Sequence, residues 1–249
     1  MSVKKMNKLV GTKGLYLSFC NYMKMNPIPV KVPIFGLIRT YHEIRNIRDN
    51  FVEERLRYKK VESYLLKKQK PCVIDCGINV GITVRWWFYL NSQAKVFGLD
   101  MMKEAHEFTN EAIKSIGPGP YEYKPVLAAL WGEDGKELKF GVTDPLYGDY
   151  GFYRQDKEEA ERVVYTRTLD SIFDPEKIDE VDLLKIDLEG AAFDALKGAT
   201  RLLKKTKYVV FEIHDIYNDK ECGEASKILT DSGFYLRWVT GKNLWWEKV

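Results

Sequence analysis

The chain has few cysteines, and their spacing does not form a framework that would hold a fold together. Its 249 residues include four cysteines, and none of them belongs to a Cys-x-x-Cys pair. Two of them, Cys72 and Cys76, lie in one predicted buried strand. This spacing excludes a disulfide scaffold and a zinc site of the usual kind. We therefore expect a reducing, cytoplasmic compartment.

Long apolar runs are also missing. A membrane-spanning helix needs about 20 consecutive apolar residues, whereas the longest run near the start, residues 32–38, has seven. The first ten residues lead into mixed polar sequence without a signal-peptide cleavage pattern. We expect a soluble protein that makes, at most, peripheral contact with a membrane.

Acidic residues are scarce in the N-terminal third. Residues 1–70 carry 16 Lys and Arg against 5 Asp and Glu, a balance of +11. Residues 71–249 carry 23 against 31, a balance of −8. A basic segment on an acidic body indicates either an appendage that meets an anionic surface or a solvated, lysine-rich helical face. The sequence leaves both interpretations open.

A boundary is predicted near residue 70, where Lys67-Lys-Gln-Lys-Pro71 separates a helical pattern from a strand pattern. Apolar residues recur at helical spacing over residues 41–68. Three prolines in residues 26–33 exclude a regular helix there. The sequence therefore predicts a basic, mainly helical N-terminal cap over residues 1–70 and a second domain over residues 71–249.

The second domain alternates strand and helix patterns, which is typical of a parallel sheet covered by helices. Two further segments, 136–142 and 162–167, are predicted to pair as a hairpin. At the end of the chain, a short turn makes the last two strands antiparallel. Strands are expected at 73–76, 95–99, 121–128, 181–187, 208–213, 234–239 and 243–247, and helices at 82–90, 103–115, 191–203 and 223–232. This is an α/β fold with a mostly parallel, seven-stranded sheet that ends in an antiparallel hairpin.

The first strand leads into a glycine loop, Asp75-Cys-Gly-Ile-Asn-Val-Gly81. Asp75 is expected at the carboxyl edge of the sheet, where open α/β sheets bind ligands. Gly77 and Gly81 allow sharp turns and a close approach of the backbone to a ligand. A dinucleotide fingerprint would also need glycine at 79 and 82, where this chain has Asn79 and Ile82. The loop therefore argues against NAD.

A second acid completes the pattern. Asp100 ends the second strand, 19 residues after Gly81, close to the spacing of about 20 expected for a carboxylate that binds a ribose. A cofactor that carries a ribose but no phosphate fits the description of S-adenosylmethionine. The alternative is an ordinary strand-turn-helix corner with glycines at its bends, which would not need Asp100.

The sequence resembles class I S-adenosylmethionine-dependent methyltransferases, with their Rossmann-like fold, and among them the FkbM family. Residues 71–215 carry the likeness, and residues 1–70 contain no motif that we recognise, so the function implied by the family does not extend to them. The matching motifs are residues 73–81, Thr168-Leu-Asp-Ser-Ile172, Leu184-Lys-Ile-Asp-Leu-Glu-Gly190, Leu196-Lys-Gly-Ala199 and Phe211-Glu-Ile-His214. The chain departs from the family at Ile78, which replaces a small residue, and at Asp100, which replaces the more common Glu.

The resemblance implies a set of cofactor contacts. Asp100 should hold the ribose, with Met101 and Ala128 beside the adenine; for these last two, plain packing is an equal alternative. Glu189 belongs to the same cofactor set. The residues implied at the methionine end are Asp75, Gly77, Asn79 and Gly81, with Thr83 near the helix start.

Candidate catalytic groups follow two later strands: Asp187, Glu212 and His214. Imidazole suits proton removal near neutral pH, although His214 fits equally well as a surface histidine. The same cluster could hold a divalent cation, which stays a minor alternative; because its spacing is not diagnostic, we assign no metal ligand. His42 and His106 are expected to be structural or solvated. The tyrosine-glycine segment 147–153 reads either as a lid over the acceptor or as an exposed hairpin tip.

These features predict an S-adenosylmethionine-dependent O-methyltransferase. The resemblance implies that its acceptor is a hydroxyl of a sugar in a glycan or glycolipid. Two alternatives remain: a methyltransferase fold that binds without catalysis, and an enzyme acting on a small-molecule natural product. Nucleic acid is not an expected partner, because the catalytic half is acidic and has no base-flipping motif of the Asn-Pro-Pro-Tyr type. Peripheral contact with an anionic surface through residues 1–70 is the one membrane interaction that the sequence suggests.

Overall fold

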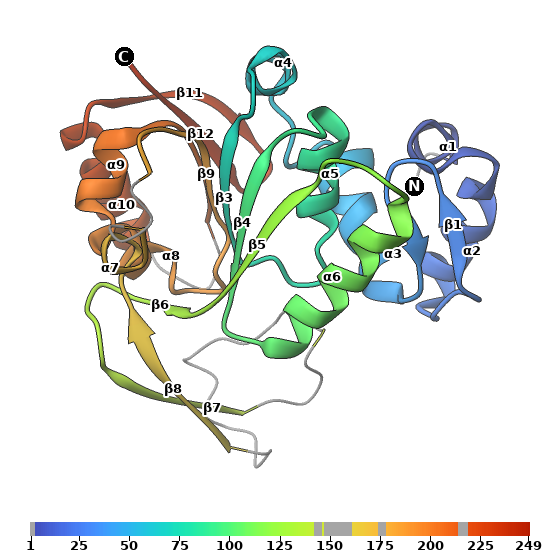
Figure 1. The fold of residues 1–249 in the computed structure, drawn as a ribbon, viewed down its shortest axis with the longest axis horizontal. Helices are drawn as coiled ribbons and strands as arrows, with labels where there is room; N and C mark the ends of the chain where they lie inside the picture. The colour runs from blue at the N-terminus through green and yellow to red at the C-terminus, as the bar shows by residue number, and fades with distance from the viewer. Residues whose placement is uncertain (1–2, 142–145, 147–160, 174–177, 214–218) are drawn as a thin grey trace.

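The computed structural model describes residues 3–141, 146, 161–173, 178–213 and 219–249. A seven-stranded sheet forms its centre (Figure 1), with the strand order β11-β12-β10-β9-β3-β4-β5. The pairs among β10, β9, β3, β4 and β5 are parallel, and β12 is antiparallel to both β10 and β11. The predicted α/β fold with a terminal hairpin is confirmed. The strands are β3 (Cys72–Cys76), β4 (Lys95–Asp100), β5 (Glu122–Leu127), β9 (Val181–Ile186), β10 (Thr206–Glu212), β11 (Phe234–Thr240) and β12 (Asn243–Lys248).

The strand order places the ligand-binding edge. From β3 the chain adds β4 and β5 on one side, and it later returns to add β9 and β10 on the other. The order therefore reverses between β3 and β9. Open α/β sheets form a crevice outside the carboxyl ends of the strands at such a switch point. The loops after β3 and β9 meet there.

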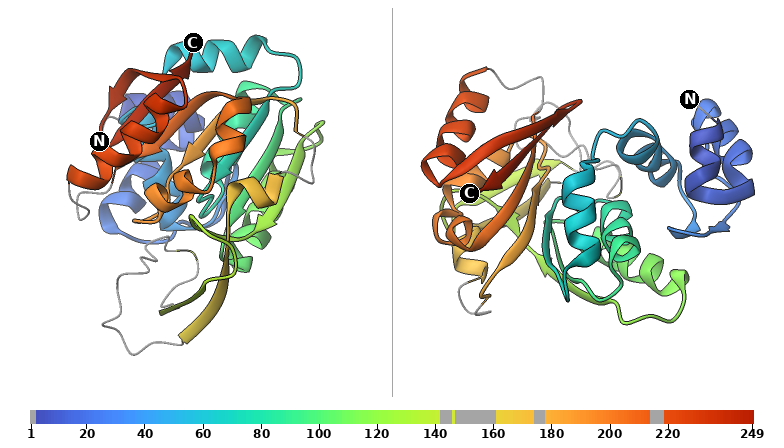
Figure 2. Two further views of the ribbon diagram at one scale, coloured as in Figure 1. Left: turned by 90° about the vertical axis from the view of Figure 1, so that its left-hand side faces the viewer. Right: turned by 90° about the horizontal axis from the view of Figure 1, so that it is seen from above.

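Helices cover both faces of the sheet and enclose two buried apolar clusters (Figures 1 and 2). One face carries the N-terminal cap together with α5 (Ile82–Leu90) and α6 (Lys103–Ile116). The other carries α7 (Leu169–Phe173), α8 (Ala192–Lys197), α9 (Thr200–Lys205) and α10 (Asp219–Asp231). No helix in the described part of the chain is long and apolar enough to cross a membrane.

The prediction of a single helix over residues 191–203 is wrong, because the chain forms α8 and α9 with a break at Gly198. A Cβ at Gly198 would lie 2.6 Å from the Trp131 carbonyl oxygen, so the chain bends where two segments touch. The Asp170 carboxylate then accepts hydrogen bonds from the Arg201 and Leu202 backbone N–H groups at the start of α9. The contact with Trp131 and these hydrogen bonds to Asp170 override the local helical pattern.

A small second sheet contains β6 (Ala129–Leu130), β7 (Glu137–Gly141) and β8 (Glu161–Arg167). β7 and β8 are antiparallel, which confirms the predicted hairpin. The tyrosine-glycine segment 147–153 lies outside the described residues.

The cap is mainly helical, as predicted, but its continuous helical pattern over 41–68 is interrupted. The π-helical turn η2 ends at Val52, and Glu54 has a left-handed φ of 59° before α4 begins. The cap contains α1 (Val3–Val10), η1 (Gly11–Lys13), α2 (Gly14–Met23), β1 (Val30–Val32), β2 (Gly36–Ile38), α3 (Tyr41–Ile47), η2 (Arg48–Val52) and α4 (Lys59–Lys67). Its apolar residues share one buried cluster with α5 and α6, and the division at residue 70 stays a prediction.

Some of the basic residues of the cap form ion pairs with acidic residues of the sheet domain. Three basic cap residues reach acids of the sheet domain: Arg39 to Glu111 at 2.6 Å, Lys60 to Glu247 at 2.6 Å, and Lys68 to Glu180 at 2.7 Å. Each pair is partly exposed, so each contributes little to stability. Together they give the cap a preferred orientation on the body.

A buried cation joins the cap to the glycine loop. Arg85 and Glu43 are fully buried and form an ion pair at 2.8 Å. Arg85 also donates to the carbonyl oxygens of Phe35 and Leu37 in the cap, and to those of Val80 and Gly81 in the loop. Burial lowers the pKa of Arg85, and Glu43 raises it in part. One side chain thus satisfies carbonyl groups from two distant segments.

We expect Arg85→Met to lower the free energy of unfolding by about 3–5 kcal/mol, because the carboxylate of Glu43 would remain buried without a positively charged partner. Urea unfolding measures the change. Lys103→Met is the matched control, since Lys103 pairs with Glu107 on an exposed face and should cost about 0.5 kcal/mol or less. Equal, small changes in the two variants would contradict a structural role for Arg85.

Candidate active site

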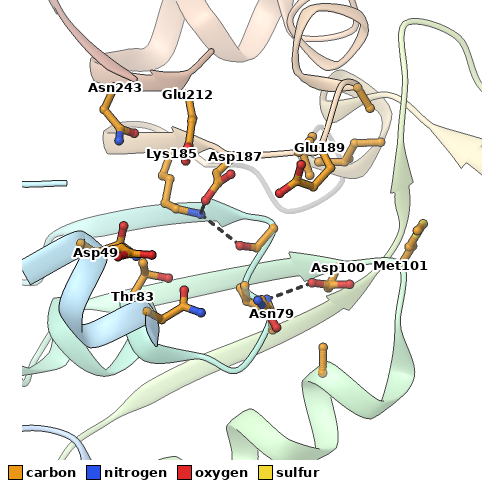
Figure 3. A pocket seen from close by; sticks show the side chains of 18 of the residues that line it. Asp49, Asn79, Thr83, Asp100, Met101, Lys185, Asp187, Glu189, Glu212 and Asn243 are labelled. Carbon is orange, nitrogen blue, oxygen red and sulfur yellow. Dashed lines mark hydrogen bonds and ion pairs between the residues drawn. The ribbon is translucent and has the colours of Figure 1, made fainter. Parts of the chain in front are cut away.

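A cavity of about 380 Å³ opens at the carboxyl ends of β3, β4, β9 and β10. The loop after β3 and the end of β4 form one side, and residues after β9 and β10 form another (Figure 3). The cap supplies a third side from α3 and η2, and the β11–β12 turn closes the rim. The sheet edge predicted to bind the cofactor therefore borders a cavity that the cap helps to enclose.

The glycine loop turns through left-handed backbone at three alternate residues: Gly77 (φ 80°), Asn79 (φ 48°) and Gly81 (φ 67°). A Cβ at Gly77 would lie 1.9 Å from the Asp187 carbonyl oxygen. A Cβ at Gly81 would lie 2.4 Å from the Thr109 hydroxyl oxygen on α6. Glycine is required at both positions by conformation and by space. Gly77 lines the cavity, whereas Gly81 supports the loop from behind.

Asp100 lies at the base of the cavity with a defined orientation. Its Oδ2 accepts a hydrogen bond from the Asn79 backbone N–H at 3.1 Å (Figure 3). Its Oδ1 accepts one from the Met102 backbone N–H at 3.0 Å. A carboxylate has about four acceptor positions, so each oxygen keeps capacity for a ligand hydroxyl. Burial raises the pKa of Asp100, while the two N–H donors oppose that shift.

Two cavity-lining side chains present buried oxygens without a hydrogen-bond partner in the described structure: Asn79 Oδ1 and Thr83 Oγ1. Buried polar atoms are normally paired, so such atoms at a cavity indicate a missing ligand. The Asn79 oxygen accepts hydrogen bonds, and the Thr83 hydroxyl can accept or donate. Together with the carboxylate of Asp100, this set suits an aminoacyl and ribosyl ligand without phosphate.

Asp75 does not line the cavity. It is fully buried, accepts a hydrogen bond from Trp87 Nε1 at 2.8 Å, and pairs with Lys185 Nζ at 3.0 Å. Lys185 Nζ also donates to the carbonyl oxygens of Cys76 and Gly77, and it lies 3.5 Å from Asp187 Oδ2. Lys185 therefore fixes the loop after β3 against the loop after β9.

The charge state of Lys185 follows from these neighbours. Burial acts to lower the pKa of Lys185. Asp75 and Asp187 together raise this pKa by more than burial lowers it, so the net pKa lies above its usual range. The ammonium group stays charged and keeps both carboxylates near it.

The structure brings most of the sequence-predicted site residues to one cavity. The lining includes Gly77, Asn79, Thr83, Asp100, Met101, Ala128, Asp187, Glu189 and Glu212, and it excludes Asp75 and Gly81. His214 lies outside the described residues. Within the described ranges, no group of three or more His, Cys, Asp and Glu side chains could hold a metal ion.

Cap residues also line the cavity, which the sequence did not predict: His42, Arg45, Asn46, Asp49, Asn50 and Arg55. The helical spacing marks Ile44 and Ile47 as buried and so leaves these residues on another face. That pattern carries no information about which surface the face meets. His42, expected to be structural or solvated, is a lining residue. His106 is structural as expected, since it is buried and bonds to the Asp100 carbonyl oxygen and the Tyr123 hydroxyl.

Comparison with known families decides the identity of the fold. The protein-family model described as "Methyltransferase FkbM domain" matches residues 61–238. The chain belongs to the FkbM methyltransferase family. Its methyl donor is S-adenosylmethionine.

A curated relative of this FkbM protein is the 2-O-methyltransferase NoeI of Sinorhizobium fredii. The two are 25% identical over 176 residues, which cover 65% of this chain and 69% of the relative. Similar solved structures include a fibrillarin pre-rRNA processing protein from Methanococcus jannaschii, with a TM-score of 0.46, 12% identity, and coverage of 73% of this chain and 67% of that chain. Aeropyrum pernix fibrillarin with natively bound S-adenosyl-L-methionine has a TM-score of 0.46, 11% identity, and coverage of 78% and 76%.

The lining fits this cofactor, which supplies an electrophilic methyl group carried on a sulfonium sulfur. We propose that Asp100 would accept hydrogen bonds from the ribose hydroxyls, because both of its oxygens are oriented and keep acceptor capacity. Met101 and Ala128 flank that end of the cavity. We propose that Gly77, Asn79 and Thr83 would hold the aminoacyl end, with Glu189 as a further cofactor contact. Asp75 and Gly81 do not line the cavity and would act indirectly, by holding the loop.

We expect Gly77→Ala to abolish cofactor binding, because its Cβ would meet the Asp187 carbonyl oxygen and force the two loops apart. Gly135→Ala is a close control: Gly135 has nearly the same φ, 79° against 80°, but nothing lies within 4 Å of its added Cβ. Titration calorimetry with S-adenosylmethionine compares them. Similar affinities for the two variants would contradict the close approach.

We expect Asp100→Asn to weaken S-adenosylmethionine binding by about tenfold or more, since one charged acceptor oxygen is lost. In the wild type, affinity should fall as the pH drops through the raised pKa of Asp100, because protonation removes the anionic acceptor. The fall should begin at a higher pH than for an ordinary aspartate. Calorimetry across a pH series tests this. A pH dependence that survives in Asp100→Asn would assign it to another group.

Proposed function

We propose that this methyltransferase transfers a methyl group to a hydroxyl of a sugar in a glycan or glycolipid. The observation that carries the proposal is the placement of Asp187 and Glu212, at the ends of neighbouring parallel strands, on the cavity wall across from Asp100. The relative NoeI, a 2-O-methyltransferase by name, supports methylation on oxygen.

Methyl transfer to a hydroxyl requires that the acceptor be aligned and that its proton be removed. In our proposal His214, two residues after Glu212, accepts this proton. Asp187 and Glu212 accept hydrogen bonds from the acceptor and orient its oxygen. The ion pair with Lys185 holds Asp187 in place, which limits the conformations that the acceptor must select.

The remaining walls suit an acceptor with many hydroxyl groups. The cap lines the cavity with Asn46, Asp49 and Asn50, and the β11–β12 turn adds Asn243. Amide and carboxylate groups offer both donors and acceptors to sugar hydroxyls. This polar lining favours a sugar over an apolar natural product. We place the reaction in the cytoplasm, in keeping with the unpaired cysteines.

The decisive assay incubates the full chain and labelled S-adenosylmethionine with matched panels of glycans, small-molecule alcohols and RNA. We expect methyl ethers on sugar hydroxyls only, identified by mass spectrometry. Transfer to small-molecule alcohols alone would move the substrate to natural products. Cofactor binding without transfer to any acceptor would replace the proposal with a non-catalytic binding function.

We expect His214→Ala to lower kcat by about 10²–10⁴-fold, the range for loss of a general base, while the Kd for S-adenosylmethionine stays within about twofold, because His214 is not among the proposed cofactor contacts. Asp231→Asn, a change on the exposed face of α10, should leave both values unchanged. A comparable loss of turnover and cofactor affinity in His214→Ala would argue against its role as the base.

A further inference from the structure

The second helix of the cap exposes an apolar surface. α2 contains no charged residue. Its exposed side chains are Leu15 (66% exposed), Phe19 (55%), Tyr22 (82%) and Met23 (53%). Met25 (46%) and Ile28 (79%) continue the surface beyond the helix. We refer to these six residues as the α2 surface.

The α2 surface is not needed for packing. Positions 15, 19, 22 and 23 have the i, i+4, i+7, i+8 spacing of one helix face. The opposite face packs into the cap through Leu17 and Cys20, which are fully buried. Soluble domains rarely expose a continuous apolar stripe of this kind unless it binds something.

Basic residues surround the α2 surface. Residues 3–31 contain six lysines and no aspartate or glutamate. All six are exposed: Lys4, Lys5, Lys8, Lys13, Lys24 and Lys31. α1 buries Met6, Leu9 and Val10 and turns its lysines outward. This part of the cap therefore combines exposed apolar side chains with a basic border.

We propose that α1 and α2 form a docking surface for an anionic phospholipid bilayer. Apolar side chains on one helix face enter the boundary between headgroups and acyl chains, while neighbouring lysines attract anionic headgroups. Tyr22 and Phe19 are aromatic residues of the kind found at this boundary.

The lysines favour a membrane over other partners. A second copy of the chain would place two sets of six lysines against each other, and like charges across an interface oppose association. Nucleic acid would attract the lysines but would offer no apolar phase for Leu15, Met23 and Ile28. An anionic bilayer satisfies both components of the surface.

The position of the α2 surface is compatible with catalysis at a bilayer. α1 and α2 form one end of the molecule, away from α9 and α10 (Figure 2). They pack against η2 and α3, and both of these elements line the active-site cavity. Docking would fix the cap wall of the cavity relative to the membrane. The proposal does not depend on the identity of the acceptor, because it can be tested without methyl transfer.

The test is flotation of the full chain with phosphatidylcholine vesicles, with and without phosphatidylserine. We expect binding to the vesicles that contain phosphatidylserine and weaker binding as salt rises, since salt screens the lysines. Free glycerol phosphate, added at the same phosphate concentration, should not compete. Equal binding to both vesicle types, or full competition by glycerol phosphate, would overturn the proposal.

Two double variants separate the components: Phe19→Ser with Tyr22→Ser, and Lys8→Gln with Lys13→Gln. Each should weaken vesicle binding by about tenfold or more, given about 1 kcal/mol for each lysine near an anionic surface. The controls alter two exposed apolar residues and two exposed lysines at the other end of the molecule: Tyr235→Ser with Val239→Ser, and Lys204→Gln with Lys205→Gln. Both controls should bind vesicles like the wild type. S-adenosylmethionine affinity should be unchanged in all four, which confirms folding.

Two outcomes would replace the bilayer with another partner. Concentration-dependent dimerisation in sedimentation velocity, lost in the Phe19→Ser and Tyr22→Ser variant, would identify the α2 surface as a self-association interface. RNA binding in an anisotropy assay, lost in the Lys8→Gln and Lys13→Gln variant, would assign the lysines to nucleic acid. Either result, together with absent vesicle binding, overturns the proposal and leaves the proposed methyltransferase reaction untouched.

Discussion

The buried guanidinium of Arg85 is the interaction on which the arrangement of cap, loop and cavity depends. It neutralises Glu43 of the cap and at the same time binds carbonyl oxygens at Val80 and Gly81 of the cofactor loop. A charged group with no solvent contact must be fully paired, because an unpaired charge in the interior is very costly. The cap can therefore adopt few positions relative to the loop, and α3 and η2 border the cavity as a result.

Lys185 plays the corresponding role on the other side of the loop. Its ammonium connects Asp75, Asp187 and two loop carbonyl oxygens. Gly77 allows the loop to approach β9 closely enough for these contacts. The loop is held from the cap side by Arg85 and from the sheet side by Lys185. It is thus preorganised for its ligand, and little conformational entropy remains to be lost on binding.

Residues that act through local spacing could be predicted from the sequence, and residues that act through distant contacts could not. The positions of Gly77, Asn79 and Asp100 follow from strand ends and chain direction, which are local properties. Asp75 belongs to the same motif, yet it faces Trp87 and Lys185 inside the protein instead of the cavity. The helical pattern also did not predict the break at Gly198, because this break depends on a contact with Trp131. His42 and Asp49 reach the cavity only because the cap docks there.

The sequence by itself determined the alternation of strands and helices, the terminal hairpin, the cofactor class and the strand ends that carry the acids. Alternation of apolar residues and the positions of glycine and proline encode these features within short stretches of chain. Only the tertiary structure decided that the basic cap forms a wall of the active site and that α2 turns an apolar face outward. Such features depend on which surfaces meet, and that is set by packing and charge pairing between segments far apart in the chain.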